Sequence, residues 1–380
     1  MHIALDGNEA NVANRVGSNV YAYQILKALE KLTAQDKTAH TVTVLLSQPP
    51  LKDLPPARRN WRYKVVGPAP LWTQFALPLH LFTNKQLYNI FFTPGHYAPR
   101  LSSIPYVSSV MDLAFLEYPE QFNQQDLLQL RDWTKYSVMK ARKVITISQF
   151  SKKQIVKHYQ REAMDIVVAY PAVHPVPLPS ESFATDVLKS FNITSPYILY
   201  VGTLQPRKNL IRLIEAFELL HQNPKNKRPL QLVLAGKVGW LAQDILDKVA
   251  SSPVSDRIVL TDYIDDEAKT ALYYKAKCSV LIGLYEGFGI PPLESLQQGT
   301  VAVVSKSSSL PEVIGDAGFL VDPVSVKSIA RGLEQAVNLS AHQRARLRKQ
   351  ARLQVQKFTW EATAKIIFDT LLEVASLRSN

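Results

Sequence analysis

Two glutamates separated by a short, stiff loop are the residues of this chain best suited to chemistry. In "LYEGFGIPPLESLQQGT", Glu286 and Glu294 have seven residues between them. Gly287 and Gly289 let the backbone approach a ligand closely, and Pro291–Pro292 fix φ for entry into a helix. Carboxylates accept paired hydrogen bonds from vicinal hydroxyls, so this spacing favours a sugar or a ribose as ligand.

Glu294 also has a purely structural interpretation, because the sequence predicts it in the first turn of that helix. There a carboxylate complements the positive end of the helix dipole by about 0.3–1 kcal/mol. This interpretation does not account for Glu286, which is expected at the carboxyl end of the preceding strand, nor for the glycines between the two acids.

A second candidate cluster lies in "YVGTLQPRKNL". The expected strand ends in Gly202, and Arg207 and Lys208 precede a helix. Two fixed cations and the backbone N–H groups of a helix N-terminus together bind a diphosphate well. Taken alone, the segment is equally consistent with a solvated basic turn.

Apolar, strand-like runs that could position these clusters alternate with helix-like stretches along the chain. The expected strands are 1–7, 40–47, 89–95, 105–113, 142–148, 197–204, 230–237, 257–264, 278–284 and 301–307. The expected helices include 20–32, 125–141, 212–222, 266–276 and 358–377. Strands this continuously apolar must be covered on both faces, so the sequence predicts an α/β fold with parallel sheets.

The length of 380 residues indicates two domains rather than one core. A proline-rich stretch at 171–183 can continue neither helix nor strand, so we expect the division there. The predicted domains are 1–180 and 181–357, followed by a final helical segment, 358–380. Open parallel sheets bind ligands at the carboxyl ends of their strands, which predicts a site between the two domains.

The charge of the chain favours anionic partners. Lys and Arg number 44 against 32 Asp and Glu, which gives +12. Basic runs at 55–64, 139–143 and 342–357 suit a nucleotide, a phosphorylated substrate or an acidic membrane surface, although a solvated helix face also explains the last. No nucleic-acid-binding module is recognisable, so nucleic acid is not an expected partner.

Location and redox state are constrained by three observations. No window of the sequence reaches 18 uninterrupted apolar residues, and "MHIALDGNEA" lacks the pattern of a secretion signal. The single cysteine, Cys278, is expected in the core and suits a reducing compartment. We therefore expect a cytoplasmic protein, with peripheral contact at the inner face of an anionic membrane.

The two clusters, with "LVLAGKVGW", "ALYYKAKCSVLIGL" and "ARKVITISQFSKKQI", resemble the retaining group-one (family-four) glycosyltransferases. The resemblance extends over nearly the whole chain and is densest from 197 to 323. It implies the GT-B fold, in which two Rossmann-like domains face each other and a last helix crosses back to the first. It also implies a nucleotide-sugar donor on the C-terminal domain and an acceptor on the N-terminal one.

The resemblance implies a role for each matched residue. Arg207 and Lys208 would stabilise the departing diphosphate, Glu286 would hold the transferred sugar and Glu294 the ribose. The remaining donor-binding candidates are Gly17 in "NRVGSNV", Gly202, Lys237, Tyr263, Gly287, Phe288, Gly289 and Ile290. Gly17 would reach the diphosphate through its bare backbone.

The family is described as transferring sugar by front-face substitution, without a carboxylate nucleophile. In that mechanism catalysis is mainly electrostatic, and the two cations take the place of a metal. We therefore expect neither a metal ion nor a resident cofactor.

One departure from the family pattern lies in "YVSSVMDLAFLEYP". Met111 stands where a histidine is common, while the following Asp112 is retained. Asp112 could orient the acceptor or cap a helix. His96, at the end of another strand, is an acceptor-binding candidate, with an exposed or structural histidine as the alternative.

The predicted function is hexose transfer, with mannose from GDP-mannose as the first choice and a UDP-sugar second. A growing glycan or lipid-linked glycan is the expected acceptor. A non-catalytic nucleotide-sugar binder is one alternative, motivated by Met111, and a sugar-nucleotide epimerase of the same fold is another. A pyridoxal-type phosphorylase is disfavoured because this chain is much shorter.

Overall fold

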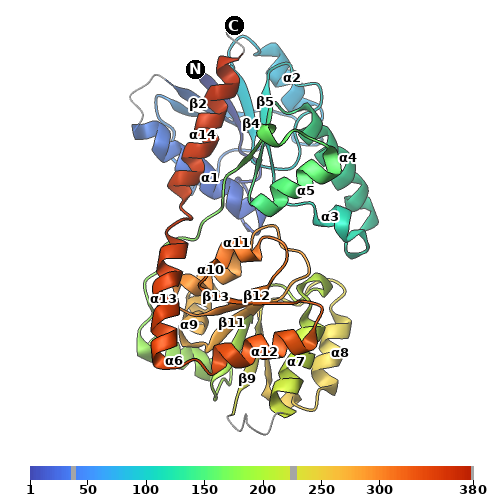
Figure 1. The fold of residues 1–380 in the computed structure, drawn as a ribbon. Helices are drawn as coiled ribbons and strands as arrows, with labels where there is room; N and C mark the ends of the chain where they lie inside the picture. Colours follow the sequence, from blue (N-terminus) through green and yellow to red (C-terminus); the bar gives the residue numbers. More distant parts are fainter. Residues whose placement is uncertain (36–39, 223–228, 378–380) are drawn as a thin grey trace. The chain divides into compact units, whose positions relative to one another are not determined.

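The computed structural model describes residues 1–35, 40–222 and 229–377, which form two compact units (Figure 1). The N-terminal unit comprises Met1–Pro171 and Thr359–Asn380, and the C-terminal unit comprises Ala172–Phe358. The units thus divide where the proline-rich stretch begins, whereas the sequence placed the division after residue 180. That position is where α6 (Glu181–Ser190) begins.

The N-terminal unit contains a seven-stranded parallel sheet in the order β3-β2-β1-β4-β5-β6-β7. Its strands are β1 (His2–Asp6), β2 (Thr41–Leu46), β3 (Trp61–Val65), β4 (Ile90–Thr93), β5 (Tyr106–Val110), β6 (Lys143–Thr146) and β7 (Ile166–Val168). Its α-helices are α1 (Ser18–Gln35), α2 (Ala76–Thr83), α3 (Ala114–Glu117), α4 (Gln124–Lys140), α5 (Gln149–Tyr159) and α14 (Trp360–Ser376). Short 3₁₀ turns lie at Pro119–Gln121 and Ala163–Asp165.

The C-terminal unit contains a six-stranded parallel sheet in the order β10-β9-β8-β11-β12-β13. Its strands are β8 (Tyr197–Val201), β9 (Gln231–Ala235), β10 (Ile258–Asp262), β11 (Cys278–Leu281), β12 (Ala302–Ser305) and β13 (Gly318–Val321). Besides α6, its α-helices are α7 (Leu210–Gln222), α8 (Gln243–Ser251), α9 (Asp266–Lys275), α10 (Ile290–Gln297), α11 (Leu310–Ile314), α12 (Val326–Val337) and α13 (Ala341–Val355). Short 3₁₀ turns lie at Pro206–Lys208 and Ser255–Arg257.

The predicted parallel α/β class is confirmed in both units, and each expected strand contains an observed one. The strand order changes direction beside β1 and β4 in one sheet and beside β8 and β11 in the other. These are the switch points at which open α/β sheets bind ligands. The loops that carry Arg207 and Glu286 follow β8 and β11, so both candidate clusters lie at one switch point.

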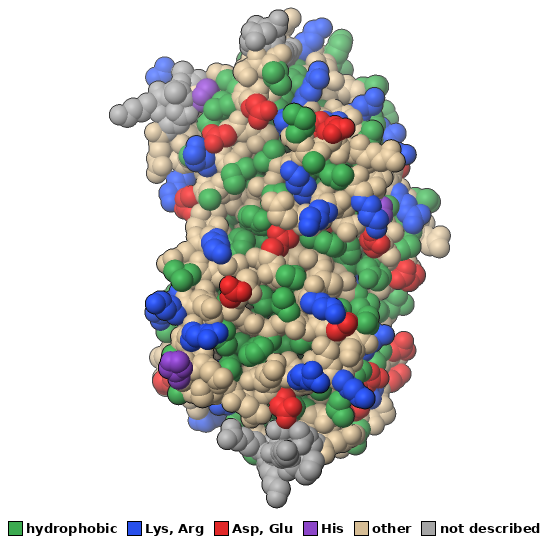
Figure 2. Space-filling view, viewed as in Figure 1, with side chains coloured by type: hydrophobic (Ala, Val, Ile, Leu, Met, Phe, Trp, Pro, Cys, Tyr) green, Lys and Arg blue, Asp and Glu red, His purple; other side chains and the backbone are tan. Residues whose placement is uncertain are grey.

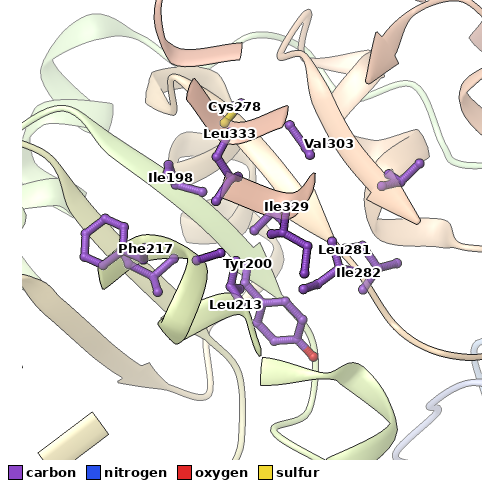
Figure 3. Packing of buried hydrophobic residues seen from close by; sticks show 14 of the residues in the cluster. Ile198, Tyr200, Leu213, Phe217, Cys278, Leu281, Ile282, Val303, Ile329 and Leu333 are labelled. Atoms are coloured by element: carbon purple, nitrogen blue, oxygen red, sulfur yellow. The ribbon is translucent and has the colours of Figure 1, made fainter. Parts of the chain in front are cut away.

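The core beneath that edge is formed by α7, α12 and the central strands of the C-terminal sheet. Figure 3 shows Phe217 and Leu213 packed with Ile198 and Tyr200, all of them fully buried. Cys278 lies in the same cluster, and burial raises the pKa of its thiol to about 12. The prediction of a core cysteine is confirmed.

The last helix, α14, packs against α1, β4 and β6 of the N-terminal unit. Its buried side includes Ile367 and Leu371, and the Trp360 ring meets Tyr21 edge to face. The Thr363 hydroxyl donates a hydrogen bond to the Tyr170 carbonyl, next to the division between the units. Within the described ranges, no helix is both long and apolar enough to cross a bilayer.

We predict that Ile367→Ala lowers the free energy of unfolding by about 2–5 kcal/mol, because it opens a cavity between α14 and the sheet. Lys365→Ala is the matched control, since Lys365 lies on the exposed side of the same helix. Urea titration followed by tryptophan fluorescence and circular dichroism measures both. Equal effects of the two substitutions would show that α14 contributes no core to this unit.

Candidate functional site

A buried ion pair joins the two clusters identified in the sequence. The Nζ atom of Lys208 lies 2.6 Å from Oε1 of Glu286, and the two side chains are only 14% and 9% exposed. Arg207, next to Lys208 in the 3₁₀ turn after β8, is half-buried, and its carbonyl accepts a hydrogen bond from Leu284 N–H at 3.0 Å. The structure thus brings Arg207, Lys208 and Glu286 together.

The two loops that carry this pair are held by polar side chains. Asn209, buried and at φ 61°, donates through Nδ2 to the carbonyls of Ile282 at 3.1 Å and Pro323 at 2.7 Å. The Ser309 hydroxyl lies 2.8 Å from the Glu286 carbonyl and 2.7 Å from that of Phe288. These bonds fix the backbone on which the charged groups stand.

Two glycines keep the end of β8 compact. Gly202, at φ 150°, would place a Cβ 2.9 Å from the Tyr200 hydroxyl. Gly236, at φ 141°, would place one 2.3 Å from the Gly202 carbonyl. Since an L-residue rarely adopts either conformation, the loops after β8 and β9 can lie this close only with glycine.

Glu294 has partners of its own from α9. Its Oε1 lies 2.8 Å from Lys269 Nζ, and its Oε2 accepts a hydrogen bond of 3.3 Å from the Tyr273 hydroxyl. Burial raises the pKa of Glu294, while Lys269 and Tyr273 oppose that shift. For Lys269, burial alone would lower the pKa, but Glu294 and Asp266 raise it above its usual value.

The prediction that Glu294 lies in the first helical turn is wrong. Gly289 adopts φ 109° and begins the helix, so α10 starts at Ile290 and Glu294 is its fifth residue. A Cβ on Gly289 would come within 2.5 Å of a Leu310 methyl, so this early start requires glycine. Glu294 therefore faces α9 rather than completing the helix N-terminus.

Two buried tyrosines interact electrostatically with the glutamates. Burial raises the pKa of Tyr200, Glu286 adds to that shift and Arg207 opposes it. Burial and then Glu294 raise the pKa of Tyr273, and Tyr200 contributes as well. These mutual effects locate both glutamates and both hydroxyls in one neighbourhood at the carboxyl edge of the sheet.

The remaining donor-binding candidates lie along the same edge or in the N-terminal unit. Lys237 follows β9 and lies 4.9 Å above the ring of the exposed Tyr263, which follows β10. Phe288 is buried and meets Phe358 edge to face, so it can offer a ligand only its backbone. Gly17 is exposed at φ 53° directly before α1, and a Cβ there would meet nothing.

Acidic groups that the sequence reasoning missed lie at the switch point of the N-terminal sheet. Asp6 ends β1 and accepts hydrogen bonds from Asn8 N–H at 3.0 Å and the Thr93 hydroxyl at 3.2 Å. Burial raises its pKa to about 7. Glu9, whose pKa burial also raises, accepts a hydrogen bond of 2.7 Å from Asn19 Nδ2. Only the position of Asp6 after an apolar run could have indicated this cluster.

His96 lies at the same edge and is partly buried. Its Nε2 accepts the Met111 N–H at 3.3 Å, so the neutral ring carries its proton on Nδ1. Nδ1 is buried and has no hydrogen-bond partner among the described residues. Burial lowers the pKa of His96, whereas Asp112 raises it. The alternative of an exposed histidine is wrong.

Asp112 caps the short helix that follows it, because its Oδ1 accepts the Ala114 N–H at 2.9 Å. Met111 is buried and its carbonyl accepts a 2.9 Å hydrogen bond from the Ser151 hydroxyl. Met111, which stands where the family commonly has a histidine, is therefore part of the packed interior of this unit.

Some residues of the C-terminal site were not singled out from the sequence. Gln205 is buried immediately before the basic turn, and its Oε1 lacks a hydrogen-bond partner within the described part of the chain. Lys269, Tyr273 and Ser309 come from elements distant in the sequence and had no local signal. In the described ranges, no group of three or more His, Cys, Asp or Glu side chains is arranged to hold a metal.

A model of the family described as glycosyl transferases, group 1, matches residues 187–354. The chain is 31% identical to O-antigen chain mannosyltransferase B of Escherichia coli over 276 residues, which cover 72% of this chain and 71% of that protein. The chain belongs to the group 1 glycosyltransferases. It is therefore a glycosyltransferase, as its resemblance implied.

Two further comparisons extend this finding. The chain is 34% identical to a serotype-specific mannosyltransferase, WbdA, of Escherichia coli over 181 residues, which cover 47% of this chain but only 22% of that longer protein. The crystal structure of Anabaena HepE in complex with UDP and glucose superposes with a TM-score of 0.71 at 17% identity, covering 97% of this chain and 98% of that one. At this identity the superposition shows the GT-B fold.

We predict that Asp6 makes folding stability depend on pH. Its folded pKa of about 7 lies above the ordinary 3.8, so the folded state keeps a proton that the unfolded state loses. The stability contributed by this proton is complete below pH 4 and is lost as pH rises toward 7, by roughly 4 kcal/mol in all.

Asp6→Asn removes this ionisation while keeping an acceptor for Asn8 N–H. The free energy of unfolding of the native chain, minus that of the variant, should therefore fall between pH 4 and pH 8. Urea titrations across this range measure the difference, and other carboxylates cancel because both proteins contain them. Parallel pH profiles would contradict the prediction.

Proposed function

We propose that this glycosyltransferase moves a hexose, with mannose as the first choice, from a nucleotide-diphosphate sugar to a glycan or lipid-linked glycan. The proposal includes retention of configuration at the anomeric carbon. Relatives named as mannosyltransferases support the choice of sugar. The observation that carries the proposal is the Lys208–Glu286 pair beside Arg207, at the switch point of the C-terminal sheet.

The diphosphate is the group that these cations suit. Arg207 has no ion-pair partner among the described side chains, so its guanidinium can form two parallel hydrogen bonds to phosphate oxygens. Lys208 adds a second charge, and the backbone of Gly289 and Ile290 leads into the positive end of α10. In the proposed reaction these groups stabilise the negative charge that grows on the leaving diphosphate.

The two glutamates suit the two sugars of the donor. Glu286 is oriented by Lys208 through one oxygen, which leaves its other oxygen for hydroxyls of the transferred hexose. Glu294 is held by Lys269 and Tyr273, and a carboxylate offers about four acceptor positions, so the ribose hydroxyls can share it. Lys237 and Tyr263 form an exposed pair suited to stack on the base.

We propose front-face substitution, in which a departing phosphate oxygen takes the acceptor proton. The glutamates then serve as hydroxyl ligands, and the cations supply the electrostatic stabilisation without a metal ion or a resident cofactor. Gly17 would offer its bare backbone to a phosphate.

In the N-terminal unit we assign the acceptor to the edge that carries His96 and Asp112. The Nδ1–H of His96 is a buried donor in need of an acceptor, which a hydroxyl oxygen of a glycan would provide. Asp112 uses one oxygen to cap α3 and has a second with which to orient a hydroxyl. The proposal includes a cytoplasmic location, in keeping with a single cysteine, and peripheral contact with an anionic membrane.

We predict that saturating GDP-mannose raises the melting temperature by about 5 °C or more, because a donor that binds only the folded state stabilises it by mass action. A thermal-shift panel of GDP-mannose, UDP-glucose and ADP-glucose tests this. GDP alone is the control for base recognition. A shift with UDP-glucose alone would mean that the donor sugar is a hexose other than mannose. The absence of any shift in the panel would contradict a nucleotide-sugar site.

We predict different effects for substitutions at the diphosphate and at the ribose. Arg207→Ala should lower kcat by about 10²–10³-fold, because its charge acts on the leaving group. Glu294→Ala should mainly weaken donor binding, by about tenfold or more, because it removes hydrogen bonds to a charged acceptor. Steady-state transfer assays and donor titrations separate the two effects.

Each variant has a matched control. Arg257→Ala removes an arginine from the opposite, amino-terminal edge of the sheet and should leave kcat unchanged. Lys269→Met breaks the same ion pair as Glu294→Ala but keeps the carboxylate. Equal weakening of donor binding by both members of that pair would assign Glu294 a structural role instead.

A further inference from the structure

The short helix α2, whose polar residues are His80 and Thr83, lies at the outside of the N-terminal unit (Figure 1). On its inner side, α2 buries Ala76, Leu77 and Leu81 in the core. On its outer side, Phe75, Leu79 and Phe82 follow one another at helical spacing and are 63%, 64% and 58% exposed. A helix with so few polar residues is normally enclosed, whereas this one leaves an apolar side uncovered within the described structure.

The exposed apolar surface extends beyond the helix. Leu71 before it and Leu87 after it are 60% and 49% exposed. Leu71 is held at φ 54°, which is unusual for a leucine, and its carbonyl accepts the Phe75 N–H at 3.0 Å. The buried Trp72 anchors this turn, since its Nε1 donates to the Val66 carbonyl at 2.9 Å. A fixed backbone therefore presents these side chains outward. We call Leu71, Phe75, Leu79, Phe82 and Leu87 the α2 surface.

The segment of chain that contains the α2 surface carries positive charges only, although Glu30 and Asp132 from other segments pair with its Arg58 and Arg100. The sequence from Leu54 to Met111 contains Arg58, Arg59, Arg62, Lys64, Lys85 and Arg100 but neither aspartate nor glutamate. Lys85 Nζ lies 5.2 Å from the Phe82 ring. Lys64 lies on the edge strand β3, near His80 of α2. Burial of His80 lowers its pKa, and the charge of Lys64 lowers it further.

We infer that the α2 surface is where this glycosyltransferase inserts into the headgroup region of an anionic lipid bilayer. Exposed aromatic and leucine side chains enter the boundary between headgroups and acyl chains, and neighbouring lysines bind lipid phosphates. The absence of acids over Leu54–Met111 fits a negatively charged occupant. Over the molecule as a whole the signs are mixed, since Figure 2 shows Asp and Glu side chains among the Lys, Arg and hydrophobic ones on the face in view.

This inference names a surface for the membrane contact in the proposed function, and it rests on that proposal for the contact's purpose. Its test needs neither donor nor acceptor. A chain that binds vesicles but transfers no sugar would contradict the proposed function and leave the membrane inference intact. A chain that transfers sugar but does not bind vesicles would contradict only the membrane inference.

The test is co-sedimentation of the full chain with vesicles of phosphatidylcholine, with or without phosphatidylglycerol. We expect binding that requires phosphatidylglycerol and weakens with salt. Phe75→Asn/Phe82→Asn should weaken it at least about tenfold, since two rings no longer leave water. Lys64→Gln/Lys85→Gln should weaken it about fivefold for each charge removed.

Matched controls remove similar groups elsewhere. Leu128→Asn/Leu353→Asn replaces two exposed leucines on α4 and α13, and Arg346→Gln/Lys349→Gln removes two exposed cations of α13. Both should bind vesicles like the native chain. An unchanged melting temperature of each variant confirms folding, and the lysine variant decides the matter if the phenylalanine variant unfolds.

Three results would overturn the inference. The first is absent or lipid-independent vesicle binding by the native chain. The second is that the control variants weaken vesicle binding as much as the α2 variants do, which would mean that binding depends on total charge or total exposed apolar area rather than on the α2 surface. The third is a dimer that Phe75→Asn/Phe82→Asn separates in buffer without lipid, since that would make a second copy the occupant.

Discussion

Burying a lysine and a glutamate together is the constraint on which the C-terminal unit's site depends. Neither charge could be taken this far out of water alone, and removing one partner of such a pair typically costs about 3–5 kcal/mol. Lys208 and Glu286 come from loops after two different strands, so their 2.6 Å contact requires both loops to hold one position. The Leu284–Arg207 backbone bond and the Asn209 side chain secure that position.

Pairing with Glu286 also gives Lys208 and Arg207 different roles in the proposed reaction. Because Lys208 is partly neutralised by Glu286, the uncompensated positive charge at the turn belongs to Arg207. The diphosphate then meets Arg207 as the stronger attractor, while the paired lysine keeps the glutamate oriented for hydroxyls. A second, partly buried pair, Lys269 with Glu294, repeats this arrangement on α9 and α10. Both glutamates are thus held in place before a ligand arrives.

The strands that hold these loops could be predicted because continuous apolar runs leave few alternatives to a parallel sheet. The edge strands β3, β7 and β13 were missed. In β3, arginine and lysine alternate with aromatic residues, so the segment was interpreted as a basic run. At the site, the Gly-rich loop and basic turn were found from their local sequence. The partners of Glu294 were not, because Lys269 and Tyr273 meet it only through helix packing. Its place beyond the first turn depended on the left-handed backbone of Gly289, which no residue type alone fixes.

The N-terminal unit is built from both ends of the chain, since α14 packs against α1, β4 and β6. On the ribosome, strands β1–β7 emerge first, and every residue of Ala172–Phe358 is synthesised before α14 leaves the exit tunnel. The apolar patch that α14 covers therefore stays open to solvent and to chaperones throughout that interval. The C-terminal unit, by contrast, is continuous in sequence and can complete its core while synthesis is still under way. The order of maturation is thus the reverse of the order of the sheets along the chain.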